Sequence, residues 1–192
     1  GVQTCALPIY RLLALGPQEI QVGILKRLRG TPIVRHDTTW GMVYNPHPPY
    51  EVLRTRLLDF ATLARLRRFA KFWDIFGNSG NFVESLPILW NTPAPFESPR
   101  ATPLESSGSG GSAFHAFLAW SDWLHAQGVK GHGIALPRQY EWLWRWSVEV
   151  RGIPAEAFGP ALARDYRRPG RLDLPPWLAP DRKSIRLNSS HI

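Results

Sequence analysis

The amino-acid sequence predicts a mainly α-helical fold, with a helical domain preceded by one or two short strands. Apolar residues recur every three or four positions over several long stretches of the chain, which is the helical period. Strand-like alternation occurs only near the start. Apolar residues make up 44% of the 192 residues, enough for a real core. We therefore expect one ordinary domain whose β structure is confined to its beginning.

The first predicted element is a strand over residues 18–26, where Ile20, Val22 and Ile24 share one face. Glycine and proline within residues 30–32 predict a turn. A second extended piece is expected over residues 40–44. The prolines of residues 45–50 exclude a helix interior there, because proline lacks the N–H that a helix needs.

The strongest helical pattern runs from Tyr50 to Phe76. Its apolar positions share one face, namely Leu53, Leu57, Phe60, Leu63, Leu66, Ala70 and Trp73. Pro49 is expected to favour the start, and Gly77 with Asn78 the end. The length also allows two helices with a break near Asp59.

Three further helices are predicted after a flexible linker over residues 91–112, which is rich in Pro, Gly, Ser and Thr. The first runs to Gly128 with apolar residues over more than half its circumference, so it must be nearly surrounded or contact another domain. The second spans residues 137–150. The third starts at Pro154, and we expect Arg164 and Asp165 on its water-facing side. Residues 167–180 are expected to lie along the surface.

Both ends of the chain resemble a sequencing adapter that has been translated. Residues 1–9 read GVQTCALPI, and residues 181–191 read DRKSIRLNSSH. With suitable codons, the reverse complement of the first segment encodes DRKSTRLNS, which differs from the second segment only at Ile185. We therefore expect residues 1–9 and 181–192 to be adapter-derived scars around a natural fragment. That fragment contains no cysteine, since Cys5 is the only one in the chain.

Composition excludes several classes of function. The formal net charge is +8 at pH 7, carried mostly by Arg, and we attribute it to a GC-rich genome rather than to a nucleic-acid surface. The histidines form neither an i, i+4 pair nor an HExxH motif, so no metal site is predicted. The sequence has no GxSxG elbow and no phosphate-binding loop. Its apolar runs are too short to span a membrane.

Several short motifs are informative as an ordered set. They are Ile20–Lys26 (IQVGILK), Leu28–Pro32 (LRGTP), Gly41 with Tyr44, Pro48–Leu53 (PPYEVL), Asn78–Phe82 (NSGNF) and the aromatic stretch Phe114–Trp120. Their order and spacing resemble the end of the barrel and the uncharacterised C-terminal helical domain of cobalamin-binding radical S-adenosylmethionine (radical SAM) proteins. The resemblance covers about residues 15–175.

The resemblance implies that residues 10–33 are the last strand and turn of a β/α barrel and that residues 34–180 are an accessory domain. It implies a bacterial, cytoplasmic parent enzyme that uses a [4Fe–4S] cluster, S-adenosylmethionine and cobalamin. Such proteins hold the cluster through a CxxxCxxC motif, which this chain lacks. We therefore expect no cofactor in this fragment, no catalysis by it alone, and the N-terminal cobalamin and radical SAM domains of the same chain as its partners.

The resemblance also suggests candidate substrate-pocket residues. Barrel enzymes build their sites at the carboxyl ends of the strands, which favours Lys26 and Arg29. Tyr50 and Glu51 are further candidates. No catalytic residue or metal ligand is assigned within this fragment, and the expected function is to cap the barrel and shape substrate access.

Two alternatives remain open. The first is a basic helical module that binds nucleic acid through Arg65, Arg67, Arg68 and Lys71, with a steep dependence on salt. The second is a non-enzymatic helical interaction domain. No membrane partner is expected in any of the three interpretations.

Overall fold

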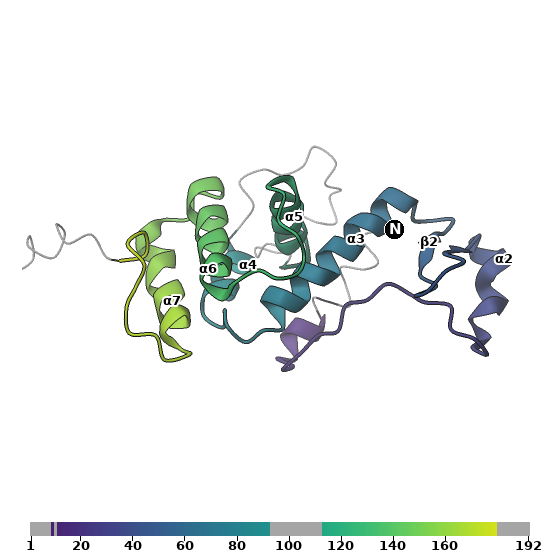
Figure 1. The fold of residues 1–192 in the computed structure, drawn as a ribbon, viewed down its shortest axis with the longest axis horizontal. Helices are drawn as coiled ribbons and strands as arrows, with labels where there is room; N and C mark the ends of the chain where they lie inside the picture. Colours follow the sequence, from purple (N-terminus) through teal and green to yellow (C-terminus); the bar gives the residue numbers. More distant parts are fainter. Residues whose placement is uncertain (1–8, 10, 93–112, 180–192) are drawn as a thin grey trace, which may run out of the picture.

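The computed structural model describes residues 9, 11–92 and 113–179. Within them the chain is mainly helical, and the sheet has two antiparallel strands, which confirms the predicted fold class. Figure 1 shows an elongated molecule, with α4 to α7 gathered at one end, α2 and β2 at the other, and α3 running between them. The adapter-like segments and the linker lie outside the described residues, except for Ile9, which is buried, and residues 91–92.

Residues 25–60 form the end opposite the helical bundle, which we call the hairpin lobe. It contains the 3-10 helix η1 (Pro32–His36), the short helix α2 (Asp37–Trp40), and the strands β1 (Val43–Tyr44) and β2 (Val52–Arg54). In the sheet, Val43 pairs with Arg54 and Tyr44 with Val52. This pairing confirms the end of the second extended piece predicted over residues 40–44, whereas its start is wrong, because Trp40 belongs to α2. Gly41 ends α2 with a φ of 55°, a left-handed conformation that glycine adopts without steric cost.

The strand predicted over residues 18–26 is wrong for most of its length. Only its end pairs, through an antiparallel bridge between Lys26 and Glu51. Beside the bridge, the Val52 N–H donates to the Leu25 carbonyl at 2.9 Å. Upstream, residues 21–24 make no backbone hydrogen bond to other described residues. The segment is therefore extended but lacks the neighbour that would make it a strand.

The helix predicted from Tyr50 to Phe76 is wrong upstream of Asp59, while the expected break near Asp59 is confirmed. Helix α3 spans Phe60–Phe72, and Asp59 caps it by accepting a 2.7 Å hydrogen bond from the Thr62 N–H. Hydrogen bonding by the Thr62 side chain, followed by its backbone N–H, holds the pKa of Asp59 below its usual value. Before the cap, the Thr55 Oγ1 accepts from the N–H groups of residues 57 and 58 and closes a turn.

The first part of the predicted apolar face is also wrong, because Leu57 and Phe60 are exposed. The buried face of α3 instead carries Leu63, Phe69 and Phe72 and continues into the π-helix η2 (Trp73–Gly77). Gly77 ends this run, as predicted. A Cβ at Gly77 would lie 3.0 Å from the Trp73 ring, so glycine allows the chain to pass close to that ring.

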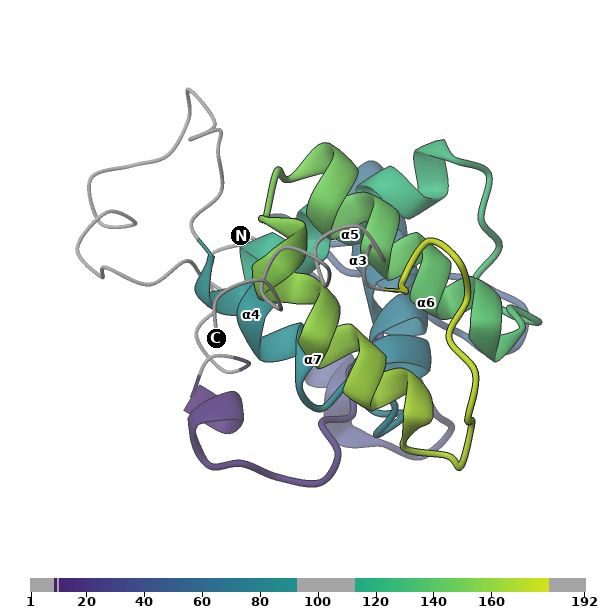
Figure 2. The same cartoon turned by 90° about the vertical axis from the view of Figure 1, so that its left-hand side faces the viewer.

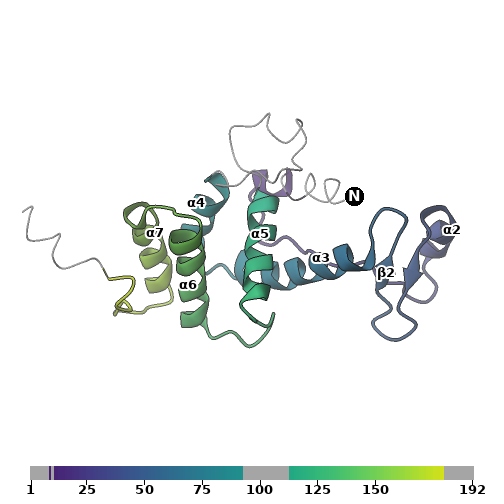
Figure 3. The same cartoon turned by 90° about the horizontal axis from the view of Figure 1, so that it is seen from above.

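The remaining helices form a bundle around an aromatic core, and the three helices predicted after the linker are confirmed. They are α5 (Ala113–Ala126), α6 (Leu136–Trp144) with the π-helix η3 (Arg145–Val150), and α7 (Ala155–Arg167). A short helix, α4 (Ser85–Asn91), packs against α5 and α7. Figure 2 shows α4 and α7 in front of the other helices, and Figure 3 shows α3 lying across them. Trp120 of α5 is fully buried, so this helix is indeed surrounded.

The prediction that Arg164 and Asp165 both face water is right for Arg164, which is largely exposed, and wrong for Asp165. The Asp165 carboxylate is fully buried against the start of α4. It accepts hydrogen bonds from the N–H of Glu84, and from the N–H and the hydroxyl of Ser85 at 2.9 and 2.7 Å. The carboxylate thus holds α7 against α4, a role that helical periodicity within α7 does not reveal.

The buried Tyr140 predicts a stability loss at alkaline pH. Its hydroxyl donates to the Asp165 carbonyl at 2.9 Å, and burial, followed by the nearby Asp165 charge, raises the pKa of Tyr140 to about 12. The folded state holds this proton more tightly than the unfolded state does. As the pH rises above 10, the ordinary pKa of tyrosine, the unfolded state therefore releases the proton first. We expect the free energy of unfolding to fall between about pH 10 and 12, by no more than about 3 kcal/mol.

The measurement is urea unfolding of the unsubstituted chain and of Tyr140→Phe at several alkaline pH values. The variant starts less stable because it lacks the hydrogen bond, and its stability should decline less steeply. Equal slopes for the two proteins would contradict the prediction.

Candidate functional site

An open groove of about 740 Å³ runs between residues 19–28, which we call the extended segment, and α3. The extended segment contributes Glu19 and Lys26 to its lining, β2's neighbour Glu51 contributes a carboxylate, and α3 contributes Arg67 and Lys71. Charges of both signs therefore line one cavity. Two of the predicted substrate-pocket residues, Lys26 and Glu51, therefore line the same groove as two residues of the nucleic-acid alternative, Arg67 and Lys71.

Asn78 fixes one end of the groove. Its side-chain amide bonds both backbone groups of Ile20: the Ile20 N–H donates to Oδ1 at 3.1 Å, and Nδ2 donates to the Ile20 carbonyl at 3.2 Å. One side chain thus bonds both backbone groups of an extended residue, as a neighbouring strand would. The sequence places Asn78 at a helix end and in the NSGNF motif, but its contact with Ile20, far away in the chain, is visible only in the structure.

The Glu51 carboxylate and the Arg67 guanidinium form the central ion pair of the groove. The distance from Arg67 Nε to Glu51 Oε2 is 2.7 Å, and the two side chains are 30% and 19% exposed. The Nε–H does not point at the carboxylate, so this nitrogen has no hydrogen-bond acceptor among the described residues. The contact is therefore a close charge pair that joins the hairpin lobe to α3.

A double-mutant cycle on Glu51→Gln and Arg67→Gln should give a coupling energy of about 1 kcal/mol, since the pair is partly shielded from water. The matched control is the pair between Arg138 and Glu141, which is 53% and 31% exposed and should couple by about 0.3–0.5 kcal/mol. Urea unfolding measures both cycles. If the coupling energy of Glu51 and Arg67 were no larger than that of the control pair, this ion pair would not be what joins the hairpin lobe to α3.

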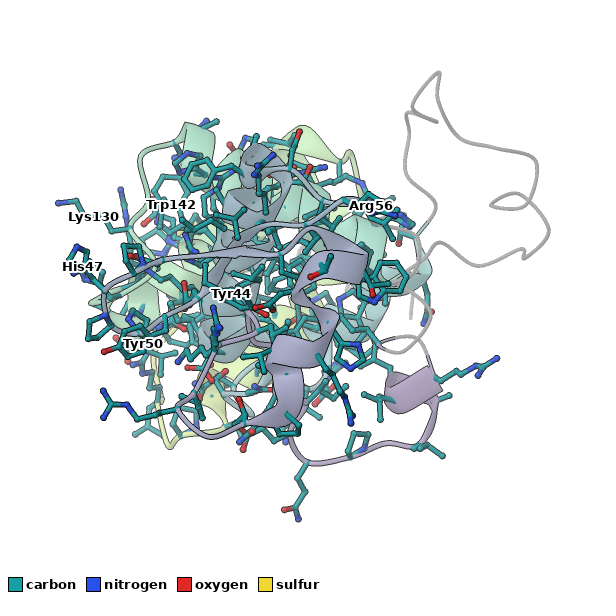
Figure 4. All side chains as sticks on the ribbon, turned by 90° about the vertical axis from the view of Figure 1, so that its right-hand side faces the viewer. Tyr44, His47, Tyr50, Arg56, Lys130 and Trp142 are labelled. Atoms are coloured by element: carbon teal, nitrogen blue, oxygen red, sulfur yellow. The ribbon has the colours of Figure 1, made fainter. Side chains whose placement is uncertain are left out.

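The remaining substrate-pocket candidates do not line this groove. Arg29 is exposed in the turn after the extended segment. Tyr50 projects at the edge of the hairpin lobe beside His47, as Figure 4 shows, and its backbone has a φ of 58°, rare for a residue with a side chain. Of the four candidates, the structure therefore brings together Lys26 and Glu51.

A second charged cluster, which sequence reasoning missed, lies inside the hairpin lobe. Arg27 pairs with Asp37 at 3.5 Å and lies over the Tyr44 ring, 5.5 Å from its centroid. Burial, together with the Asp37 carboxylate, raises the pKa of Tyr44. These residues stabilise the lobe, which holds the neighbouring Lys26 in place at the groove.

Of the four basic residues of the nucleic-acid alternative, two form ion pairs within the fold and two do not. Arg65 pairs with Asp122 of α5 at 2.5 Å, and Arg67 pairs with Glu51. Arg68 and Lys71 form no ion pair with a described residue. Two of the four charges are thus already neutralised within the fold.

The described ranges contain no group of three or more His, Cys, Asp or Glu residues placed to hold a metal ion. No helix within them is long and apolar enough to cross a membrane. Chemically, the groove presents two ammonium groups, one ion pair and flanking carboxylates, an arrangement suited to binding a polar group rather than to a nucleophilic reaction.

Residues 38–98 match the model of a family described as a protein of unknown function (DUF4080). The match covers about a third of the chain, from α2 through α4, and includes Glu51, Arg67 and Lys71 of the groove. Neither a curated protein nor a solved structure matches the chain significantly.

Proposed function

We propose that this chain is the C-terminal accessory part of a cobalamin-dependent radical SAM enzyme, where it caps the barrel, shapes substrate access and is not catalytic alone. The proposal assigns the [4Fe–4S] cluster, S-adenosylmethionine and cobalamin to other domains of the parent. A bacterial, cytoplasmic location accompanies it, since such clusters suit a reducing compartment.

The observation that carries the proposal is the incompletely paired extended segment. Its last residues pair with the chain before β2, while the backbone of residues 21–24 bonds to no other described residue. An unpaired strand edge is a template for a further strand. The existing pairing is antiparallel, so a parallel barrel neighbour would occupy the opposite edge.

Exposed apolar side chains on the hairpin lobe support the same arrangement. Most exposed large apolar residues of the described chain lie there, including Leu28 at 57% and Leu57 at 63%. Exposed apolar patches commonly mark interaction surfaces. In the proposed enzyme this surface would pack against the barrel and bring Lys26 and Glu51 to the barrel's edge, where they would contact substrate.

The isolated chain should bind a dye that fluoresces on apolar surface, and Leu28→Asp with Leu57→Asp should reduce that fluorescence. Leu172→Asp is the matched control, because Leu172 is 93% exposed but lies beyond α7, away from the lobe. A chain that unfolds cooperatively and does not bind the dye would contradict the exposed docking surface.

The decisive experiment is to read the source locus upstream of the codon for Tyr10. The proposal expects a CxxxCxxC motif in the same reading frame, preceded by a cobalamin-binding region. A start codon close to Tyr10 would refute it.

A further inference from the structure

We infer that the junction of α3 with the loop after α5 is a binding site for the phosphate group of a small phosphorylated ligand. A niche of about 310 Å³ lies there, beside the groove at the extended segment, with which it shares Lys71. Its lining includes Arg68 and Lys71 of α3, His125 at the end of α5, and Lys130 of the following loop. The proposal does not depend on the radical SAM assignment.

The charges of the niche are of one sign. No Asp or Glu belongs to its lining, and its basic side chains form no ion pair with described residues. Arg68 is half-buried, and its Nε is shielded from water without a hydrogen-bond acceptor among the described residues. Protein atoms already cover that nitrogen, so an anion in the niche would instead meet the basic side-chain heads, which no carboxylate of the lining neutralises.

The loop adds backbone donors to these side chains. The N–H groups of Lys130 and Gly131 bond to no described acceptor, whereas the neighbouring N–H groups of Val129 and His132 are bonded. Gly131 lies against the stem of Lys71, since a Cβ there would be 3.1 Å from the Lys71 Cβ. Backbone amides close to lysine and arginine heads are a common way of binding phosphate.

The position at the end of α5 does not oppose an anion. A helix C-terminus carries a partial negative charge on its free carbonyl groups. Here the N–H groups of Gln127, Gly128 and Val129 already bond the carbonyls of the last turn. The basic side chains therefore dominate the field in the niche.

Convergence of the charges favours a small ligand over a nucleic acid. A polymer binds through cations spread along a surface, but Arg65 and Arg67 on the same helix are paired with carboxylates. The niche volume lies at the lower end of small-molecule sites, and Phe72 and Val129 supply an apolar wall for an organic group. Figure 4 shows Lys130 projecting from the edge of the molecule, where a ligand can reach it.

The test is titration of the chain with inorganic phosphate, followed by NMR of backbone amides and by calorimetry. Saturable 1:1 binding is expected, with the largest shifts at Lys130 and Gly131. Lys130→Gln, in an exposed loop, should weaken binding about tenfold, and Arg68→Gln at least as much. Arg138→Gln is the control, because Arg138 is similarly exposed but stacks on Trp142 outside the niche.

Unsaturable binding, or equal affinity in the unsubstituted chain and Lys130→Gln, would overturn the inference. A single-stranded RNA oligonucleotide provides the second arm. RNA binding that is tighter than phosphate binding and is weakened by Arg138→Gln as much as by Lys130→Gln would also overturn it, because the charged surface would then extend beyond the niche.

Discussion

Asp165→Ala should lower the free energy of unfolding by about 3–5 kcal/mol. The substitution leaves the amide of Glu84 and both donors of Ser85 without their buried acceptor. It also removes the negative charge close to Arg168, whose guanidinium lies 3.4 Å from the carboxylate. Because the carboxylate holds α4 against α7, its loss should loosen the bundle end rather than one helix.

Urea unfolding followed by circular dichroism measures the effect, with two controls. Asp165→Asn keeps the volume and one acceptor oxygen, so its loss should be smaller. Asp173→Ala removes an exposed carboxylate after α7 and should change stability by less than about 0.5 kcal/mol. A loss below about 1 kcal/mol for Asp165→Ala would show that water replaces the carboxylate and that the buried contact is unimportant.

Asp165 also shows where sequence reasoning stops. The helical period correctly predicted α5, α6 and α7, because each buries a stripe that recurs locally. A polar residue next to Arg164 on such a helix is normally solvated, and nothing within α7 distinguishes Asp165. Its partners at residues 84 and 85 lie about eighty positions away, so only the packed structure reveals them.

The error upstream of Asp59 has a similar cause. Leu53 and Leu57 fit the helical period, yet Val52–Arg54 pairs with β1 and Leu57 is exposed in a turn. Strand pairing is non-local, and here it overrides the local helical pattern. The capping residue itself was accessible from sequence, since an Asp before an apolar helical run is a common N-cap.

The sequence predicted single residues of the groove but not the groove itself. Lys26 and Glu51 came from the resemblance, and Arg67 and Lys71 came from the charge pattern of a helix. Sequence could not indicate that Glu51 neutralises Arg67, because this contact crosses from the hairpin lobe to α3. The niche shows the same limit, since Lys130 joins Arg68 only when the loop after α5 packs on α3.

Trp73→Ala should destabilise the fold by about 3–5 kcal/mol, the usual range for removing a fully buried tryptophan. Its ring stacks on Phe69 at 5.7 Å and on Trp90 of α4 at 5.9 Å, and it meets the edge of Phe117 of α5 at 5.0 Å between centroids. One side chain therefore joins α3, α4 and α5. The cavity left by alanine would separate these helices at the centre of the aromatic core.

Trp73→Phe distinguishes ring packing from the polar nitrogen. Trp73 Nε1 is buried without a hydrogen-bond partner among the described residues, so phenylalanine removes an unsatisfied donor while it keeps an aromatic ring. We expect this variant to lose less than about 1.5 kcal/mol. Trp40→Ala, at a site that is 43% exposed in the hairpin lobe, is the control for losing an indole outside the core. If urea unfolding gave equal losses for Trp73→Ala and Trp40→Ala, the aromatic stack would not be what holds the three helices together.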